Sequence, residues 1–320
     1  MNFSNPAQPN QGDSTTKDRI EYLEIDPAFR RNPIAPKLPI YLPVVQFFIG
    51  ILSSLFPKLT SKIAFRLFRT PRKRAKHSKS DKILEAARIE EIIVGSNTLK
   101  FYTWGGGDKN ILLVHGWESR GTALRAFAKP LTNQGYKVIA IDLPAHGDST
   151  GRHTSIPESA AAITTIIHKF KGIEAIITHS YGGLALAYAS RKMIPNQPIP
   201  KAIMMGVPLN FSDLLLKIER LLNISEKVLP YVHEIIFDIT GEYPSEMNIP
   251  AAAQQTKIEQ LLILHDKNDQ ISSIKNAQEI NEAWSNSHLV ITEGLGHYRI
   301  LKNKQAVERV VDFIVKNNSN

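Results

Sequence analysis

Three residue types that can cooperate in hydrolysis follow one another along this chain, in the order serine, aspartate and histidine. Ser180, the pair Asp266 and Asp269, and His297 each come shortly after an apolar run typical of a buried strand. A serine hydroxyl is a weak nucleophile until a neighbouring base takes its proton, and a histidine held by a carboxylate can be that base. The chain therefore has the side chains for covalent catalysis at Ser180, if the fold brings these strand ends together.

The residues around Ser180 predict a strand, a tight turn and a helix. The run 175–179 ends at the serine, and two glycines at 182–183 and a small-residue helical pattern follow. Such a turn strains the serine backbone and exposes its hydroxyl above a sheet. A side chain at position 182 would strike the strand or the helix. Thr178 replaces the first glycine of the G-x-S-x-G pattern, and a serine that merely caps the helix is the alternative interpretation.

The remaining pattern indicates the scaffold that must position these residues. Apolar runs alternate with helical patterns from Ile111 onward, which predicts a parallel sheet with helices on both faces. Residues 89–94 and 98–104 are expected to form a hairpin that turns at 95–97. Helices are expected near residues 121–134, 157–170, 181–193, 273–284 and 304–316.

The strand-end motifs, in this order, resemble the α/β-hydrolase superfamily over about residues 88–314. They are His115-Gly116-Trp117, the 142–149 stretch, the Ser180 turn, the Asp266 to Asp269 loop and Gly294-Leu295-Gly296-His297. The resemblance implies an α/β-hydrolase fold, with a mostly parallel central sheet and helices on both faces. It also implies a bacterial serine hydrolase of the esterase, lipase or serine aminopeptidase type, with Ser180 as nucleophile and His297 as base.

The same resemblance places the triad acid a few residues beyond its strand. Asp269 fits that placement, whereas Asp266 abuts the strand and is expected to tie the loop together by hydrogen bonds to the backbone; both remain candidates. The acid would fix the tautomer of His297 and stabilise its protonated form. An oxyanion hole needs two backbone N–H donors, which the resemblance assigns to Trp117 and Tyr181.

Cofactor and metal chemistry find no support in the sequence. Its 320 residues include no cysteine, no P-loop, no G-x-G-x-x-G after a first strand and no H-x-x-x-H. No cofactor and no metal are therefore expected. His115, His146 and His179 are expected to have structural roles.

Composition divides the chain into three parts. Residues 1–17 are rich in Asn, Gln, Ser, Pro and Thr and are expected to be a disordered tail. Residues 18–87 form an apolar and basic extension, and 88–318 form the hydrolase domain. At about 207–257 the strand and helix alternation breaks, and Leu- and Ile-rich helical patterns predict a helical lid over the active site. Helices that simply pack on the core are the alternative.

The extension combines an uncharged apolar run at 38–57 with a basic cluster, in a chain of net charge +9. Three interpretations stay open: a helix packed on the hydrolase domain, an interfacial anchor on an anionic membrane surface, and a single membrane span. No nucleic-acid-binding motif accompanies the basic residues, so nucleic acid is not an expected partner. The cluster consists of Lys58, Lys62, Arg66, Arg69, Arg72, Lys73, Arg74 and Lys76.

The extension also bears on location. A basic flank after a membrane segment keeps the following domain in the cytoplasm, so the expected location is cytoplasmic, free or at the inner face of the membrane. Because the triad, the oxyanion donors and the lid segment all follow Arg88, catalysis is not expected to need the extension.

The expected activity is hydrolysis of a small-molecule carboxylic ester through an acyl-enzyme at Ser180. The apolar lid and extension favour an apolar acyl or aryl group. Cleavage of an amide or peptide, as in serine aminopeptidases, is the alternative within the class. A non-catalytic α/β-hydrolase that binds an apolar ligand or a partner is the alternative of another class, and only the replacement at Thr178 favours it.

Overall fold

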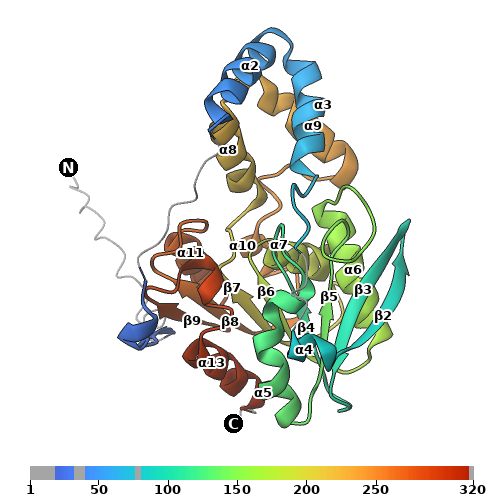
Figure 1. Ribbon diagram of the computed structural model, residues 1–320, viewed down its shortest axis with the longest axis vertical. Helices are drawn as coiled ribbons and strands as arrows, with labels where there is room; N and C mark the ends of the chain where they lie inside the picture. Colours follow the sequence, from blue (N-terminus) through green and yellow to red (C-terminus); the bar gives the residue numbers. More distant parts are fainter. Residues whose placement is uncertain (1–18, 32–39, 76–80, 317–320) are drawn as a thin grey trace, which may run out of the picture.

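The computed structural model describes residues 19–31, 40–75 and 81–316, and its centre is a nine-stranded sheet in the order β1-β9-β8-β7-β6-β4-β5-β3-β2 (Figure 1). The tail expected at 1–17 lies outside these residues. Strand β3 pairs antiparallel with β2 and β5, and the other pairings in the sheet are parallel. The strands are β1 (Ile20–Tyr22), β2 (Arg88–Val94), β3 (Asn97–Trp104), β4 (Asn110–Val114), β5 (Lys137–Ile141), β6 (Ile173–His179), β7 (Ile199–Met205), β8 (Ile258–Asp266) and β9 (Ser287–Thr292).

Helices cover both faces of the sheet, so the chain has the α/β-hydrolase architecture that the sequence predicts. One face carries α6 (Ile156–Lys169), α7 (Tyr181–Tyr188) and α11 (Ile274–Ala283). The other carries the 3-10 helix η2 (Gly121–Phe127), α5 (Ala128–Asn133) and α13 (Lys304–Val315). Shorter helical segments are η1 (Pro27–Phe29), α4 (Lys82–Glu85), the π-helical turn η3 (Ala189–Met193) and α12 (Gly296–Arg299).

The apolar runs of the sequence become strands because a central parallel strand is covered on both faces. In β4, Ile111 and Leu113 point into the core under α5 and α13, whereas Leu112 and Val114 point into the core under α6 and α7. The expected hairpin is confirmed as β2 and β3. The helix expected at 181–193 is α7 followed directly by η3.

Between β7 and β8 the chain leaves the sheet and forms a helical insertion. It comprises α8 (Phe211–Leu222), the 3-10 helix η4 (Glu226–Val228), α9 (Leu229–Thr240) and α10 (Ile249–Ala252). Leu215 of α8 and Val232 and Ile236 of α9 are buried in the interior. Helices α8 and α9 stand beyond one end of the sheet (Figure 1).

The extension joins the hydrolase domain at two places. Strand β1 lies parallel to β9 at the edge of the sheet. The apolar run becomes α2 (Leu42–Leu55), which ends before Pro57, and α3 (Pro57–Phe68) turns back beside it. This α2–α3 hairpin packs on α8, η4 and α9 of the insertion (Figure 1). Among the described residues, no helix combines the length and the apolar character needed to cross a bilayer.

Candidate active site

Ser180 is the single residue between β6 and α7, and its backbone has a conformation that residues with side chains rarely adopt. Its φ is +49° and its ψ is −122°. The Ser180 N–H donates to the carbonyl of Met205 on the neighbouring β7 at 2.9 Å, and the Ser180 carbonyl accepts from Gly183 N–H at 2.9 Å. Two buried elements thus hold a strained serine at the carboxyl edge of the sheet.

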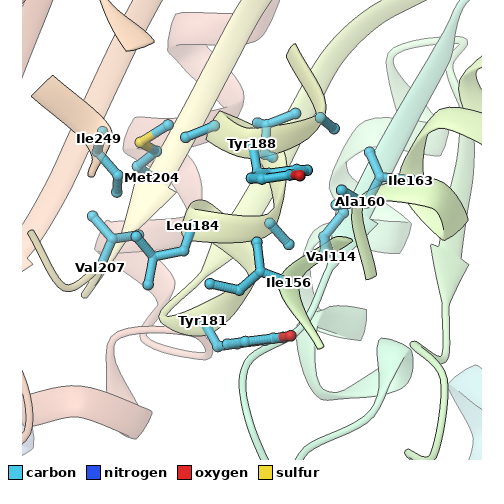
Figure 2. Close-up of a cluster of buried hydrophobic side chains, with 14 of the residues drawn as sticks. Val114, Ile156, Ala160, Ile163, Tyr181, Leu184, Tyr188, Met204, Val207 and Ile249 are labelled. Atoms are coloured by element: carbon cyan, nitrogen blue, oxygen red, sulfur yellow. The ribbon is translucent and has the colours of Figure 1, made fainter. Parts of the chain in front are cut away.

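Helix α7 can pack against the sheet only because its second and third residues are glycines. A Cβ at Gly182 would lie 2.7 Å from the His115 carbonyl oxygen, and one at Gly183 would lie 2.4 Å from a methyl of Val207. Figure 2 shows Tyr181, Leu184 and Tyr188 of α7 among apolar side chains of the sheet and of α6. Thr178 is buried and its hydroxyl donates to the Ile203 carbonyl at 3.0 Å, which holds β6 against β7.

His297 and Asp269 form a buried pair beside this turn. Asp269 Oδ2 lies 2.7 Å from His297 Nδ1, and its Oδ1 accepts the N–H groups of Ile271 and Ser272 at 2.7 and 2.9 Å. Burial raises the pKa of Asp269, but the hydrogen bond from His297 and the two backbone donors outweigh it, so the net pKa is lowered. Asp269 is therefore a charged acceptor that can fix the tautomer of His297.

Asp266 makes a different set of contacts. Its Oδ1 accepts from Asn268 N–H at 2.9 Å, and its Oδ2 accepts from the Thr292 hydroxyl at 2.8 Å and from Leu295 N–H at 2.9 Å. These bonds join the loop after β8 to the loop after β9. Of the two acids that the sequence leaves open, the structure brings Asp269 to His297 and commits Asp266 to the loops.

Two neighbours of His297 were missed by the sequence interpretation. His179, expected to be a packing residue, has its Nε2 3.0 Å from the His297 carbonyl oxygen, with the two ring centroids 4.6 Å apart. Gly206 has φ +58°, and a Cβ there would lie 3.2 Å from His297 Nδ1 and 3.3 Å from Asp269 Oδ2. The Met-Met-Gly ending of β7 was a usable signal for Gly206, because a glycine just after a parallel strand often marks a close approach.

The residues expected to supply the oxyanion donors, Trp117 and Tyr181, contact each other through their rings next to Ser180. Trp117 follows β4, and its ring meets the Tyr181 ring edge to face at 5.4 Å. The Tyr181 hydroxyl lies 3.1 Å from Ser159 Oγ on α6, which anchors the start of α7. A Cβ at Gly116 would lie 3.0 Å from Ser180 Cβ, so the loop that carries Trp117 runs directly past the serine.

Glu118 ties that loop to the extension. It has a left-handed backbone, with φ +53°. Its carboxylate accepts from Arg72 N at 2.8 Å, Arg72 Nε at 2.9 Å and Arg72 Nη2 at 3.0 Å. Burial raises the pKa of Glu118, but the Arg72 bonds outweigh it and the net pKa is lowered. Arg72, in the segment that follows α3, thus fixes the position of Glu118, the residue after Trp117.

Ser180 and His297 line one cavity of about 760 Å³. Its apolar wall comes from Trp117 and from the insertion, and its cationic side chains include Arg69, Arg72 and Lys73. The insertion residues are Phe211, Leu214, Ile218, Ile236, Ile239 and Met247. No group of three or more His, Cys, Asp or Glu side chains within the described ranges is placed to hold a metal ion.

The extension also lines this cavity, although the residues that the sequence assigns to catalysis all follow Arg88. Phe65 and Phe68 of α3 face the cavity, and the Phe68 ring stacks on Trp117 at 6.4 Å and meets Phe211 at 5.2 Å. Arg69 donates to Glu158 at 2.8 Å, which fastens the end of α3 to α6. The positions of the candidate residues along the chain do not indicate which elements enclose them.

Known proteins with the same fold resemble this chain. A sequence profile of the alpha/beta hydrolase family matches residues 111–313, and the chain belongs to that family. A pyrethroid hydrolase of Sphingobium wenxiniae is 28% identical over 85 residues, which are 26% of this chain and 30% of that protein. The chain therefore matches under a third of the length of this curated relative.

Solved structures show the same fold. An esterase of Pyrococcus furiosus matches with a TM-score of 0.58 and 19% identity, over 77% of this chain and 96% of its own. A bacterial membrane phospholipase A matches with a TM-score of 0.55 and 16% identity, over 86% of this chain and 98% of its own. At these identities the likeness concerns the fold.

Gly206→Ala should slow the reaction of Ser180 with a fluorophosphonate probe by about tenfold, because the new methyl group displaces the His297–Asp269 pair by a few tenths of an ångström. Gly95→Ala is the matched control: Gly95 also has φ +58°, but nothing lies within 4 Å of its added Cβ. Both variants should lose about 1–2 kcal/mol of stability to backbone strain. Equal labelling rates in the two variants would contradict this role for Gly206.

The unfolding free energy should fall as the pH drops below 6.5. Burial lowers the pKa of His115 to about 4, and burial, with smaller effects of neighbouring histidines, lowers those of His146 and His179 to about 3, from the ordinary 6.5. The unfolded chain then binds protons that the folded protein does not, at about 1.4 kcal/mol per pH unit for each histidine. His146→Gln should reduce the slope measured by urea denaturation between pH 6.5 and 5, and the exposed His168→Gln is the control. An unchanged slope in His146→Gln would refute this account.

Proposed function

We propose that this protein is a serine hydrolase that cleaves carboxylic esters through an acyl-enzyme at Ser180. The observation that carries the proposal is the position of the strained Ser180 and of His297 on one cavity, with the buried Asp269 paired to His297 behind it. Family membership supports hydrolytic chemistry. Asp269 is the proposed acid because it contacts the histidine, whereas Asp266 is occupied by the loops.

The proposed reaction has two steps. Ser180 Oγ attacks the ester carbonyl carbon while His297 Nε2 takes the hydroxyl proton, and the tetrahedral intermediate collapses when His297 returns that proton to the leaving alcohol. A water molecule then gives a proton to His297 and attacks the acyl carbon, and Ser180 leaves with that proton as the acid product departs. Asp269, kept charged by its three donors, holds the imidazole and stabilises its protonated form.

The negative charge on the carbonyl oxygen needs donors that are already in place. We assign these to the N–H groups of Trp117 and Tyr181, which belong to the loop after β4 and to the start of α7. The ring contact between the two residues and the Tyr181–Ser159 bond support a fixed geometry. Preorganised donors cost no reorganisation at the moment of reaction, which is why a rigid loop suits this role.

The cavity wall supports an apolar acyl or aryl ester as the substrate class. Aromatic and aliphatic side chains of α3, α8 and α9 surround the space beyond Ser180, and we propose that the insertion acts as a lid over it. The pyrethroid hydrolase and the esterase among the similar proteins fit an ester rather than an amide. Cleavage of p-nitrophenyl esters of increasing acyl length, with matched p-nitroanilides, would measure both preferences.

Ser180→Ala should abolish both ester turnover and fluorophosphonate labelling while the fold remains, because the variant lacks the attacking oxygen. Loss of a triad member typically costs several orders of magnitude in rate. Labelling is read by mass spectrometry and turnover by p-nitrophenol release, with the exposed Ser245→Ala as control. Wild-type protein that neither labels nor turns over any ester would instead favour a non-catalytic binding protein.

Asp269→Asn should lower kcat/KM far more than Asp266→Asn does. The first change leaves His297 in the wrong tautomer, which typically costs about 10⁴-fold in kcat. The second replaces one of two accepting oxygens by an NH2 group, so some of the loop hydrogen bonds are lost and the change should mainly lower thermal stability. Steady-state kinetics and melting curves of both variants test this together. A larger kinetic defect in Asp266→Asn would move the acid to Asp266.

A further inference from the structure

In the α2–α3 hairpin, small polar residues face inward and large apolar residues face outward, the opposite of a helix pair that faces water. The residues that α2 and α3 turn inward include Ser53, Thr60 and Ser61, which are 0%, 4% and 1% exposed. Ser53 Oγ accepts from Ser225 N–H at 2.9 Å, and Gln46 Nε2 donates to the Leu221 carbonyl at 2.9 Å. Helices that face water normally turn their polar residues outward, so the outer face of this hairpin is adapted to another environment.

The outward residues of the hairpin are large and apolar. On α2 they recur with the spacing of a single helix face, and on α3 they recur every fourth residue, so the two helices and their turn form one surface. A large exposed apolar patch on a monomer marks a site of interaction. We call this surface the hairpin face; its side chains are between 43% and 67% exposed and are Val44, Phe47, Phe48, Ile51, Leu55, Phe56, Leu59, Ile63 and Leu67.

A stripe of positive charge accompanies the hairpin face. Lys58, Lys62 and Arg66 each precede one of the apolar residues of α3, and all three are exposed. Within the described part of the chain, none of the three has an ion-pair partner. Residues 27–80 contain no aspartate or glutamate. The adjoining η4 carries Glu226 next to Lys227 and so adds no net charge.

We propose that the hairpin face docks this protein on the surface of a lipid bilayer that contains anionic lipid. The apolar side chains would enter the boundary between headgroups and acyl chains, and the three basic side chains would meet the phosphates. A second copy of the chain would bring an identical basic stripe to the contact and no acidic stripe to match it, whereas anionic headgroups match the apolar and the basic component together.

The docking face and the reaction cavity share helix α3. Its outer side carries Leu59, Ile63 and Leu67, and its inner side places Phe65 and Phe68 in the cavity wall. The hairpin turn lies at the end of the molecule remote from the sheet, with α8 and α9 of the insertion beside α2 and α3 (Figure 1). Docking would thus bring the insertion and α3 to the lipid and leave the sheet in water. This inference goes beyond the hydrolase function and does not depend on it.

Flotation of the full-length protein with unilamellar vesicles tests the proposal. Vesicles of phosphatidylcholine alone are compared with vesicles that also contain phosphatidylglycerol, each at low and high salt. Wild type should float with the anionic vesicles, and high salt should weaken this binding. Replacement of Lys58, Lys62 and Arg66 by Gln should weaken it about 100-fold, from about fivefold for each charge near the surface.

The apolar part is tested by Phe47→Gln combined with Phe48→Gln, which should abolish flotation. Both residues are exposed, so the fold should survive, as the melting temperature and the far-UV circular dichroism spectrum will report. Ile89→Gln with Ile93→Gln on the exposed side of β2 is the apolar control. Replacement of the exposed Lys129, Lys257 and Lys302 by Gln removes the same charge elsewhere. Both controls should bind as wild type does.

Three results would overturn the proposal. Wild type that floats with neither vesicle would refute it directly. The second result is a dimer in sedimentation equilibrium that the Phe47 and Phe48 changes dissociate. Such a dimer, in a protein that does not bind vesicles, would mean that the hairpin face contacts a second copy of the chain. If the control variants lose vesicle binding as much as the hairpin variants do, the binding comes from the overall positive charge of the protein and not from the hairpin face. Ester turnover is measured separately in solution, so a failed hydrolase assignment would leave this test intact.

Discussion

The left-handed backbone of Ser180 is the constraint on which the rest of the site depends. A residue with a side chain in this conformation costs on the order of 1–3 kcal/mol, which the surroundings must offset. Helix α7 does so, because Leu184 and Leu186 are fully or almost fully buried and each contributes about 1.5–3 kcal/mol relative to exposure. Relaxing the serine would pull α7 away from the sheet, and the close approach at Gly182 leaves no room to move the other way. Packing therefore outweighs strain, and the hydroxyl stays at the sheet edge.

Much of this architecture could be predicted from local sequence, because central parallel strands are apolar on both faces. The runs at β4, β6 and β8 are of this kind, and residues just after such strands meet at one edge of the sheet. Ser180 and His297 could be located for that reason. The choice between Asp266 and Asp269 depended on a resemblance, since their spacing from the strand differs by only three residues and only the contacts distinguish them.

The extension could not be predicted in the same way. Strand β1 has three residues, Ile20–Tyr22, too few for an alternation to be recognised. The run at 38–57 is so uniformly apolar that its sequence does not say which side faces inward. The side that contacts the insertion carries Gln46, Gly50 and the buried Ser53. The role of His179 was hidden because a ring that donates to a carbonyl 118 residues away leaves no local pattern.

The extension and the reaction site are mechanically one unit. The Arg72–Glu118 pair cannot hold them together alone, because the Arg72 side chain is 78% exposed and exposed ion pairs contribute about 0–1 kcal/mol. The aromatic contacts of Phe68 with Trp117 and Phe211 hold the two surfaces, and such pairs add about 0.5–1.5 kcal/mol each beyond burial. The ion pair instead orients the loop, because it fixes the carboxylate of Glu118, a residue with a strained backbone that directly follows Trp117. A displacement of α3 would therefore move Phe65 and Phe68 of the cavity wall and, through Arg72, the proposed oxyanion loop, whereas the outward side chains of α2 do not line the cavity.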